Sequence, residues 1–218
     1  MMKPDALDGA IDRPARVRDP VATIARIRKA ATQEFGKEGF NGGSMQRIAK
    51  HAGVSKQIVY HYFSSKTELY KDIVREMSLA CLDVLTSFRD DASDEEVIRS
   101  FLESLYDIYR DNWTIAALTF DQNVQMGSQV SYHRDAKIKH DRLVKRLHDA
   151  VVSGQSNGTI SPKIAIGDFE FMSILIMSAC ATSRPAFAKI LDTVDLPERD
   201  DAFWKDYAVS FVMRAIRP

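Results

Sequence analysis

A chain of 218 residues, of which 45% are hydrophobic, can bury a substantial core, and its length suits a small domain joined to a larger one. Basic and acidic residues balance at 30 each, and the longest apolar stretch, 169–181, is shorter than the roughly 20 residues of a membrane helix, which excludes a membrane-spanning protein. No export signal opens the sequence and its two cysteines form no CxxC pair, so we expect a protein of the reducing cytoplasm.

The neutral total conceals an uneven distribution of charge. Residues 1–66 carry a net charge of +6, and residues 67–218 carry −6. A basic amino-terminal part on an acidic body is typical of a protein that meets a polyanion at one end. Chance segregation of solvated charges is the alternative, because net charge informs about partners and not about fold.

Residues 1–20 predict a flexible amino-terminal arm, because they hold three prolines and few large apolar groups. The arginines of this arm can reach a minor groove, or the arm is a disordered tail without a defined contact. From residue 21, apolar residues recur at three- and four-residue steps and predict a helix that ends at Gly39. The glycines near its end match no phosphate-binding pattern and indicate caps and turns.

Two short helices follow, joined by a tight glycine turn. Ser44 is placed to cap the first, which ends at Gly53, and Ser55 is placed to cap the second. In the second helix Val59 and Tyr62 share an inward face, which leaves Lys56, Gln57 and His61 pointing outward. Two short helices with a polar leading edge are the geometry that fits a major groove of DNA.

The run from Ile27 to Lys66 resembles the DNA-binding domain of the TetR family of transcriptional regulators. The residues that carry the resemblance are Ala30–Ala31, Phe35, Gly39–Phe40, Ser44, Ile48–Ala49, the AGVS run at 52–55, Tyr60, Tyr62–Phe63 and Lys66–Leu69. The resemblance implies a three-helix head, an all-helical body that binds a small molecule and dimerises, and repression relieved by that ligand.

The resemblance also assigns roles within the head. It places Ser44, Tyr60 and Lys66 near phosphates and puts Lys56 and Gln57 at the leading edge of the recognition helix, where they can read bases. His61 either approaches phosphate or faces water. The complete predicted DNA-binding set is Ser44, Arg47, Ser55, Lys56, Gln57, Tyr60, His61 and Lys66. Arg47, Gln57 and Ile58 depart from the common family pattern, which leaves the base preference open.

The remainder of the chain predicts further helices and no sheet. Capping-box spacings at Ser65/Glu68 and Ser93/Glu96 begin two of them. Others are expected at about 113–125, 130–152, 163–181 and 201–217, with a turn-rich connector at 154–162. The fold class is therefore all-α, with an arm at 1–20, a helix-turn-helix domain at 21–66 and a ligand-binding and dimerisation domain at 67–218.

The last two predicted helices are apolar around much of their circumference. The resemblance implies that they form a homodimer interface, and burial within one subunit is the alternative. Candidates for the lining of a ligand cavity, chosen by position, are Tyr106, Tyr109, Trp113, Phe120, Tyr132 and His133. Each of them can instead be plain core or surface.

The sequence offers no support for a metal site, a cofactor or catalysis. His133, His140 and His148 lie more than about 10 Å apart along one helix, so that helix cannot gather them on one ion. No hydrolase elbow or metalloprotease motif is present, and we expect no enzyme. The leading hypothesis is an operator-binding repressor with a small-molecule effector, and the alternative is a ligand-independent or architectural DNA-binding protein.

Overall fold

The computed structural model describes residues 19–89, 91–124, 134–183, 187, 189–190 and 199–218. Every regular element in these ranges is a helix, which confirms the all-α expectation. The elements are α1 (Pro20–Gly42), α2 (Met45–Ala52), α3 (Lys56–Tyr62), α4 (Lys66–Leu85), α5 (Asp94–Asp111), α6 (Trp113–Val124), α7 (Arg134–Ser156), α8 (Ile166–Thr182) and α10 (Asp201–Ala215). Within these ranges no helix is both long and apolar enough to cross a membrane. Residues 1–18 of the expected arm lie outside the described part.

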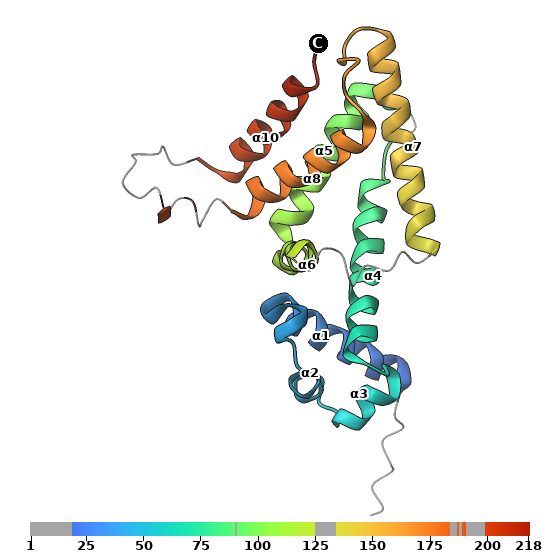
Figure 1. Ribbon diagram of the computed structural model, residues 1–218, viewed down its shortest axis with the longest axis vertical. Coiled ribbons are helices and arrows are strands. Elements are labelled where there is room, and N and C mark those ends of the chain that lie inside the picture. Colours follow the sequence, from blue (N-terminus) through green and yellow to red (C-terminus); the bar gives the residue numbers. More distant parts are fainter. Residues whose placement is uncertain (1–18, 90, 125–133, 184–186, 188, 191–198) are drawn as a thin grey trace, which may run out of the picture.

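Helices α1, α2 and α3 form a head at one end of the molecule, and α4 rises from it into the body (Figure 1). The hydroxyl of Ser44 caps α2 by accepting the amide N–H of Arg47, and Gly53 ends α2 in the left-handed conformation with φ of 66°. The head core contains residues of all four helices and also Leu118 of α6, which is fully buried there.

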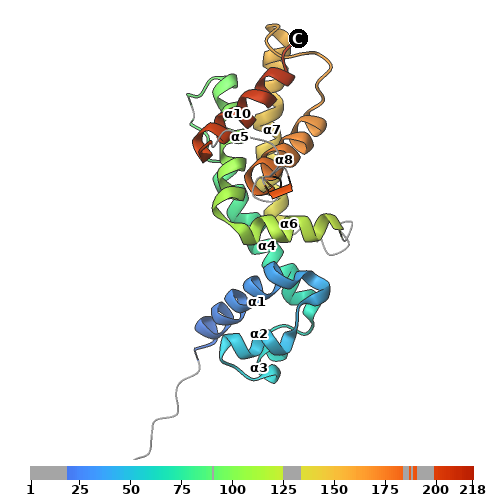
Figure 2. The same cartoon turned by 90° about the vertical axis from the view of Figure 1, so that its left-hand side faces the viewer.

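The body packs α5 at its centre, against α4, α6, α7, α8 and α10. Ser93 and Glu96 form the predicted capping box at the start of α5. Helix α6 lies across the base of the body and packs directly on α1 of the head (Figure 2). The head and body therefore meet along two routes, through the continuous α4 and through the contact between α6 and α1.

Three boundaries differ from the sequence expectation. Gly39 breaks the helical geometry with φ of 66° as predicted, but α1 continues in a further turn to Gly42. Helix α7 runs three residues into the expected connector, to Ser156, and within them Gly154 packs so closely on Ile160 that an added Cβ would lie 2.5 Å from the Ile160 side chain. At the start of α4, Glu68 accepts the N–H of Ser64 and not that of the capping residue Ser65.

Candidate DNA interface and ligand cavity

The outer face of α3 presents polar side chains to solvent. Lys56, Gln57 and His61 are all exposed, and Tyr60 is 42% exposed. The hydroxyl of Ser55 caps the helix by accepting a backbone N–H of its first turn. A short helix with an exposed polar edge and a capped amino end has the shape and the donors needed to enter a major groove.

A buried carboxylate joins α1 to the amino end of α2. Glu34 is 5% exposed, and its Oε1 accepts the Ser44 N–H at 2.8 Å and the Arg47 Nε–H at 2.8 Å. The Arg47 guanidinium also donates to the Gly42 carbonyl at 2.7 Å. Burial by itself raises the pKa of Glu34, but these hydrogen bonds outweigh it and lower the pKa. Arg47 therefore braces the turn before α2, and any contact it makes with DNA competes with Glu34.

Lys66, at the start of α4, is also engaged within the head. Its Nζ donates to the Asn41 carbonyl at 3.1 Å and lies 4.9 Å from the centre of the Phe40 ring. At the exposed edge of α3, the Nζ of Lys56 lies 5.7 Å from the centre of the Tyr60 ring. The structure thus holds Lys66 close to the glycine turn after α1, whereas Lys56 and Tyr60 extend from the head surface.

On the outer face of α2, Arg47 is the residue that the sequence predicted to meet DNA. Gln46, Lys50 and His51 are exposed there, opposite the buried Met45 and Ile48. The sequence pattern indicates this exposed face, because apolar and polar residues of α2 recur at helical spacing. These three residues extend the polar surface of α3 onto its neighbour.

The body contains a cavity of about 430 Å³ between five helices. Residues from α4, α5, α6, α7 and α8 line it, namely Val74, Arg75, Met77, Ser78, Cys81, Leu82, Leu85, Phe101, Leu105, Tyr109, Ile115, Thr119, Gln122, Asn123, Ala136, His140, Leu143, Glu170, Phe171, Ile174 and Leu175. Burial raises the pKa of the Cys81 thiol to about 11, so this thiol is un-ionised at neutral pH. A mostly apolar cavity with a few polar groups is typical of a small-molecule site.

The structure places one of the six predicted cavity residues, Tyr109, on the cavity wall. Tyr106 is 1% exposed in the body core, and Trp113 and Phe120 are 69% and 70% exposed on the surface, so these three do not line the cavity. Tyr132 and His133 lie outside the described residues. The candidates were chosen by their position along the chain. Because successive residues of a helix point about 100° apart, position alone does not decide which side chains face the cavity.

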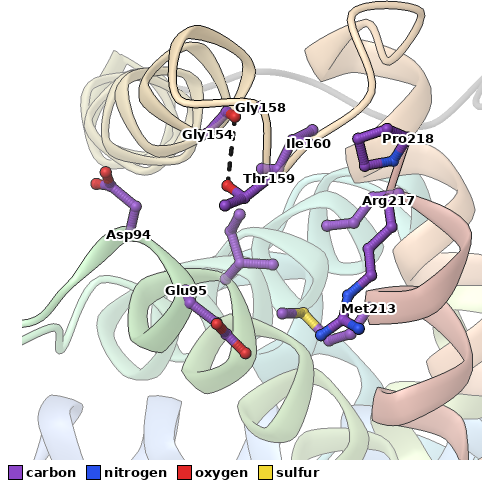
Figure 3. A pocket seen from close by; sticks show the side chains of 11 residues that line it. Asp94, Glu95, Gly154, Gly158, Thr159, Ile160, Met213, Arg217 and Pro218 are labelled. Atoms are coloured by element: carbon purple, nitrogen blue, oxygen red, sulfur yellow. Dashed lines mark hydrogen bonds between the residues drawn. The ribbon is translucent and has the colours of Figure 1, made fainter.

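Two smaller cavities lie elsewhere. One of about 260 Å³ opens at the end of the body remote from the head. Figure 3 shows Asp94 and Glu95 on one side of it and Met213 and Arg217 on the other, with Thr159 donating to the Gly154 carbonyl. Another, of about 280 Å³, lies where α1, α4 and α6 meet. Among the described residues, no group of histidine, cysteine, aspartate and glutamate is placed to hold a metal ion.

A carboxylate of α6 holds the head to the body. Asp121 Oδ2 accepts the Phe40 N–H at 3.0 Å and the Tyr70 O–H at 2.6 Å. Burial and the hydrogen bond to Asp121 both raise the pKa of Tyr70. Gly39 is required beside it, because an added Cβ would lie 2.6 Å from Asp121 Oδ1. Asp121 thus joins α6 to the break in α1 and to α4, one residue before the cavity-lining Gln122.

Helices α8 and α10 lie side by side and leave an apolar face in solvent. Part of the apolar surface predicted on them is buried within the subunit, including Phe169, Met177 and Val212. The exposed large apolar residues on the two helices are Phe171, Met172, Leu175, Tyr207 and Phe211. Burial within one subunit therefore accounts for part of this apolar surface, and the remainder is exposed.

Comparison with known proteins gives consistent matches for the head and for the whole chain. Residues 27–73 match the family model described as bacterial regulatory proteins, tetR family. The chain is 30% identical over 174 residues to the HTH-type transcriptional repressor SCO4008 of Streptomyces coelicolor, covering 80% of this chain and 85% of that protein. It is 23% identical over 204 residues to the HTH-type transcriptional repressor NicS of Pseudomonas putida, covering 93% and 96%.

The fold of the whole chain is also found in solved structures. FadR from Bacillus subtilis, in complex with stearoyl-CoA, superimposes with a TM-score of 0.62 at 15% identity, covering 89% of this chain and all of that one. The match to SCO4008 spans 174 residues and therefore extends well beyond the segment 27–73 that the family model covers. The chain therefore belongs to the TetR family of bacterial transcriptional regulators.

Proposed function

We propose that this chain is a dimeric, sequence-specific repressor that leaves its operator when a small molecule enters the body. The observation that carries the proposal is the path of α4. Its first turns, with Leu69 and Tyr70, are buried in the head core, and its later turns, with Ser78 and Cys81, line the cavity. Because one helix belongs to both sites, a ligand that prefers one orientation of α4 changes how the head fits DNA.

The proposed reading residues are Lys56 and Gln57. Lysine can donate to the acceptors of guanine, and glutamine can pair with adenine, in the major groove. Ser44, Tyr60 and Lys66 are proposed to meet phosphates, since helix amino-termini and cations favour anions. The remaining residues of the predicted set are proposed to flank these contacts, with Arg47 bracing the turn through Glu34.

Dimerisation is proposed to occur through the exposed faces of α8 and α10. Phe211 and Tyr207 are more than half exposed, and large apolar side chains gathered on neighbouring helices are costly to leave in water. A two-fold dimer would carry two heads, and heads separated by roughly 34–36 Å match successive turns of a palindromic site. The proposal also includes the division of the chain into an arm at 1–20, a DNA-binding domain at 21–66 and a ligand-binding and dimerisation domain at 67–218.

The comparisons support repression and a small-molecule effector. SCO4008 and NicS are both named transcriptional repressors, and FadR was solved with stearoyl-CoA bound. Since the operator is part of the bacterial chromosome, we propose that the protein acts in the cytoplasm.

Fluorescence anisotropy with DNA from upstream of its own gene tests the proposal. We expect a complex that weakens with salt and that binds random DNA far less tightly. Lys56→Ala should weaken the specific complex roughly tenfold or more, because it removes a base contact. The matched control is Lys163→Ala, which removes an exposed cation in the loop before α8. Equal affinity for random DNA would overturn the proposal in favour of an architectural binder.

A further inference from the structure

The charges on the wall of the body cavity are already balanced. Among the described residues that line it, the charged ones are Arg75, His140 and Glu170. Arg75 NH2 lies 2.8 Å from Asp135 Oδ2, and its NH1 lies 3.5 Å from Glu76 Oε1. His140 Nε2 lies 2.9 Å from Glu170 Oε1. Each charge therefore has its counter-charge before a ligand arrives.

The pair of His140 and Glu170 links α7 to α8 at the cavity. The side chain of Glu170 is 18% exposed, so its carboxylate is largely withdrawn from water. The hydrogen bond to Glu170 raises the pKa of His140 more than desolvation lowers it, which favours the imidazolium and an ion pair. A carboxylate has the capacity to accept further hydrogen bonds while it keeps this partner.

The rest of the wall is apolar or uncharged. Leu105, Leu143 and Ile174 are among its hydrophobic residues, and Thr119 and Gln122 contribute a hydroxyl and an amide from α6. A charged ligand entering this space would lose its hydration and find the wall charges already in ion pairs, which costs free energy. Among the charged groups described on the wall, only the buried Nε–H of Arg75 lacks a hydrogen-bond acceptor. An uncharged ligand loses little and can still donate a hydrogen bond.

We propose that the effector is an uncharged, mainly apolar molecule with a hydroxyl or amide group. The ion pair of His140 and Glu170 sets this preference for an uncharged ligand. This inference rests on the proposed function. The volume of about 430 Å³ lies near the lower end of the roughly 300–1,000 Å³ of small-molecule pockets. A bicyclic aromatic skeleton is a suitable size for a probe.

Three naphthalene probes of matched shape test the charge preference on the full chain by titration calorimetry at about pH 7. They are 2-naphthylmethanol, the anion 2-naphthoate and the cation 2-naphthylmethylammonium. We expect the alcohol to bind about tenfold or more tightly than either ion, because neither ion finds an unpaired counter-charge. Equal or tighter binding of either ion, or no binding of any probe, overturns the proposal.

His140→Gln should reverse the preference. It leaves Glu170 without its cationic partner, so the ammonium probe should become the tightest of the three. The matched control is His148→Gln, which changes an exposed histidine of the same helix outside the cavity and should keep the wild-type order. An unchanged order in His140→Gln would overturn the role of the pair.

Glu170→Gln keeps the test decisive if His140→Gln fails to fold. It removes the Glu170 carboxylate that faces His140. Lowering the pH to about 5.5 should then protonate the imidazole and strengthen the binding of naphthoate relative to the binding of the alcohol. If naphthoate binding does not strengthen at the lower pH, the proposed role of the ion pair is wrong. Operator binding measured without probe on the same preparations reports on the proposed function separately, since it does not depend on the charge preference of the cavity.

Discussion

Replacing Asp121 with alanine should loosen the joint between α6 and the head. The carboxylate accepts hydrogen bonds from the Phe40 N–H and the Tyr70 O–H, and Tyr70 is fully buried. The alanine variant leaves both donors without this acceptor in a partly desolvated place. An unsatisfied buried donor costs about 1–3 kcal/mol, and the Phe40 N–H is only partly buried, so we expect the two together to cost about 2–4 kcal/mol.

That loss converts to a measurable change in melting temperature. A chain of this length loses about 2–4 °C per kcal/mol, so Asp121→Ala should melt roughly 4–16 °C below the wild type. Calorimetry at one fixed protein concentration is the assay, because the proposed dimerisation would make the melting temperature depend on concentration. The control is Asp149→Ala, which removes an exposed carboxylate of α7 and should have the same melting temperature as the wild type.

The double variant provides the sharper test. Tyr70→Phe in the Asp121→Ala background removes the orphaned hydroxyl, so the double variant should be more stable than Asp121→Ala alone. Asp121→Ala should also weaken operator binding, because Asp121 positions the break in α1. A melting temperature within about 2 °C of the wild type, or no recovery in the double variant, would refute the reasoning.

The remaining predictions concern other parts of the molecule. Arg47→Ala should lower the melting temperature at neutral pH, and the deficit should shrink below about pH 4.5, because the stability from the lowered pKa of Glu34 is complete above that pH and is lost as pH falls through the folded-state value. The raised pKa of His140 contributes stability below about pH 6.5 that is lost as pH rises through the folded-state value. The melting difference between wild type and His140→Gln should therefore shrink from about pH 6 to 9, and a growing difference would contradict the ion pair. Phe211→Glu should shift the proposed dimer to monomer in sedimentation velocity, since it places a charge among the exposed apolar residues of α10.

Much of the head could be predicted because its signals are local. The side chains of Ser44 and Ser55 cap helices within three residues of themselves, and Gly53 adopts the left-handed turn that its lack of a side chain permits. The outward direction of Lys56 and Gln57 follows from the inward direction of Val59 on the same short helix. None of these inferences requires knowledge of distant residues.

The cavity and the joints between helices were not accessible in this way. Glu34 and Arg47 lie on different helices, and Asp121 reaches Phe40 across 81 positions of the chain. The role of His140 could not be read from its helix alone, because its contact with Glu170 exists only once α7 packs on α8.

The sequence by itself therefore determined the helices, their caps and the polar edge of the head, since these depend on residues within one or two turns. Only the tertiary structure decided that Tyr109 faces the cavity while Tyr106 does not, and that α4 and Asp121 connect that cavity to the head. The physical reason is that helix packing selects which face turns inward, and packing is a property of the whole chain.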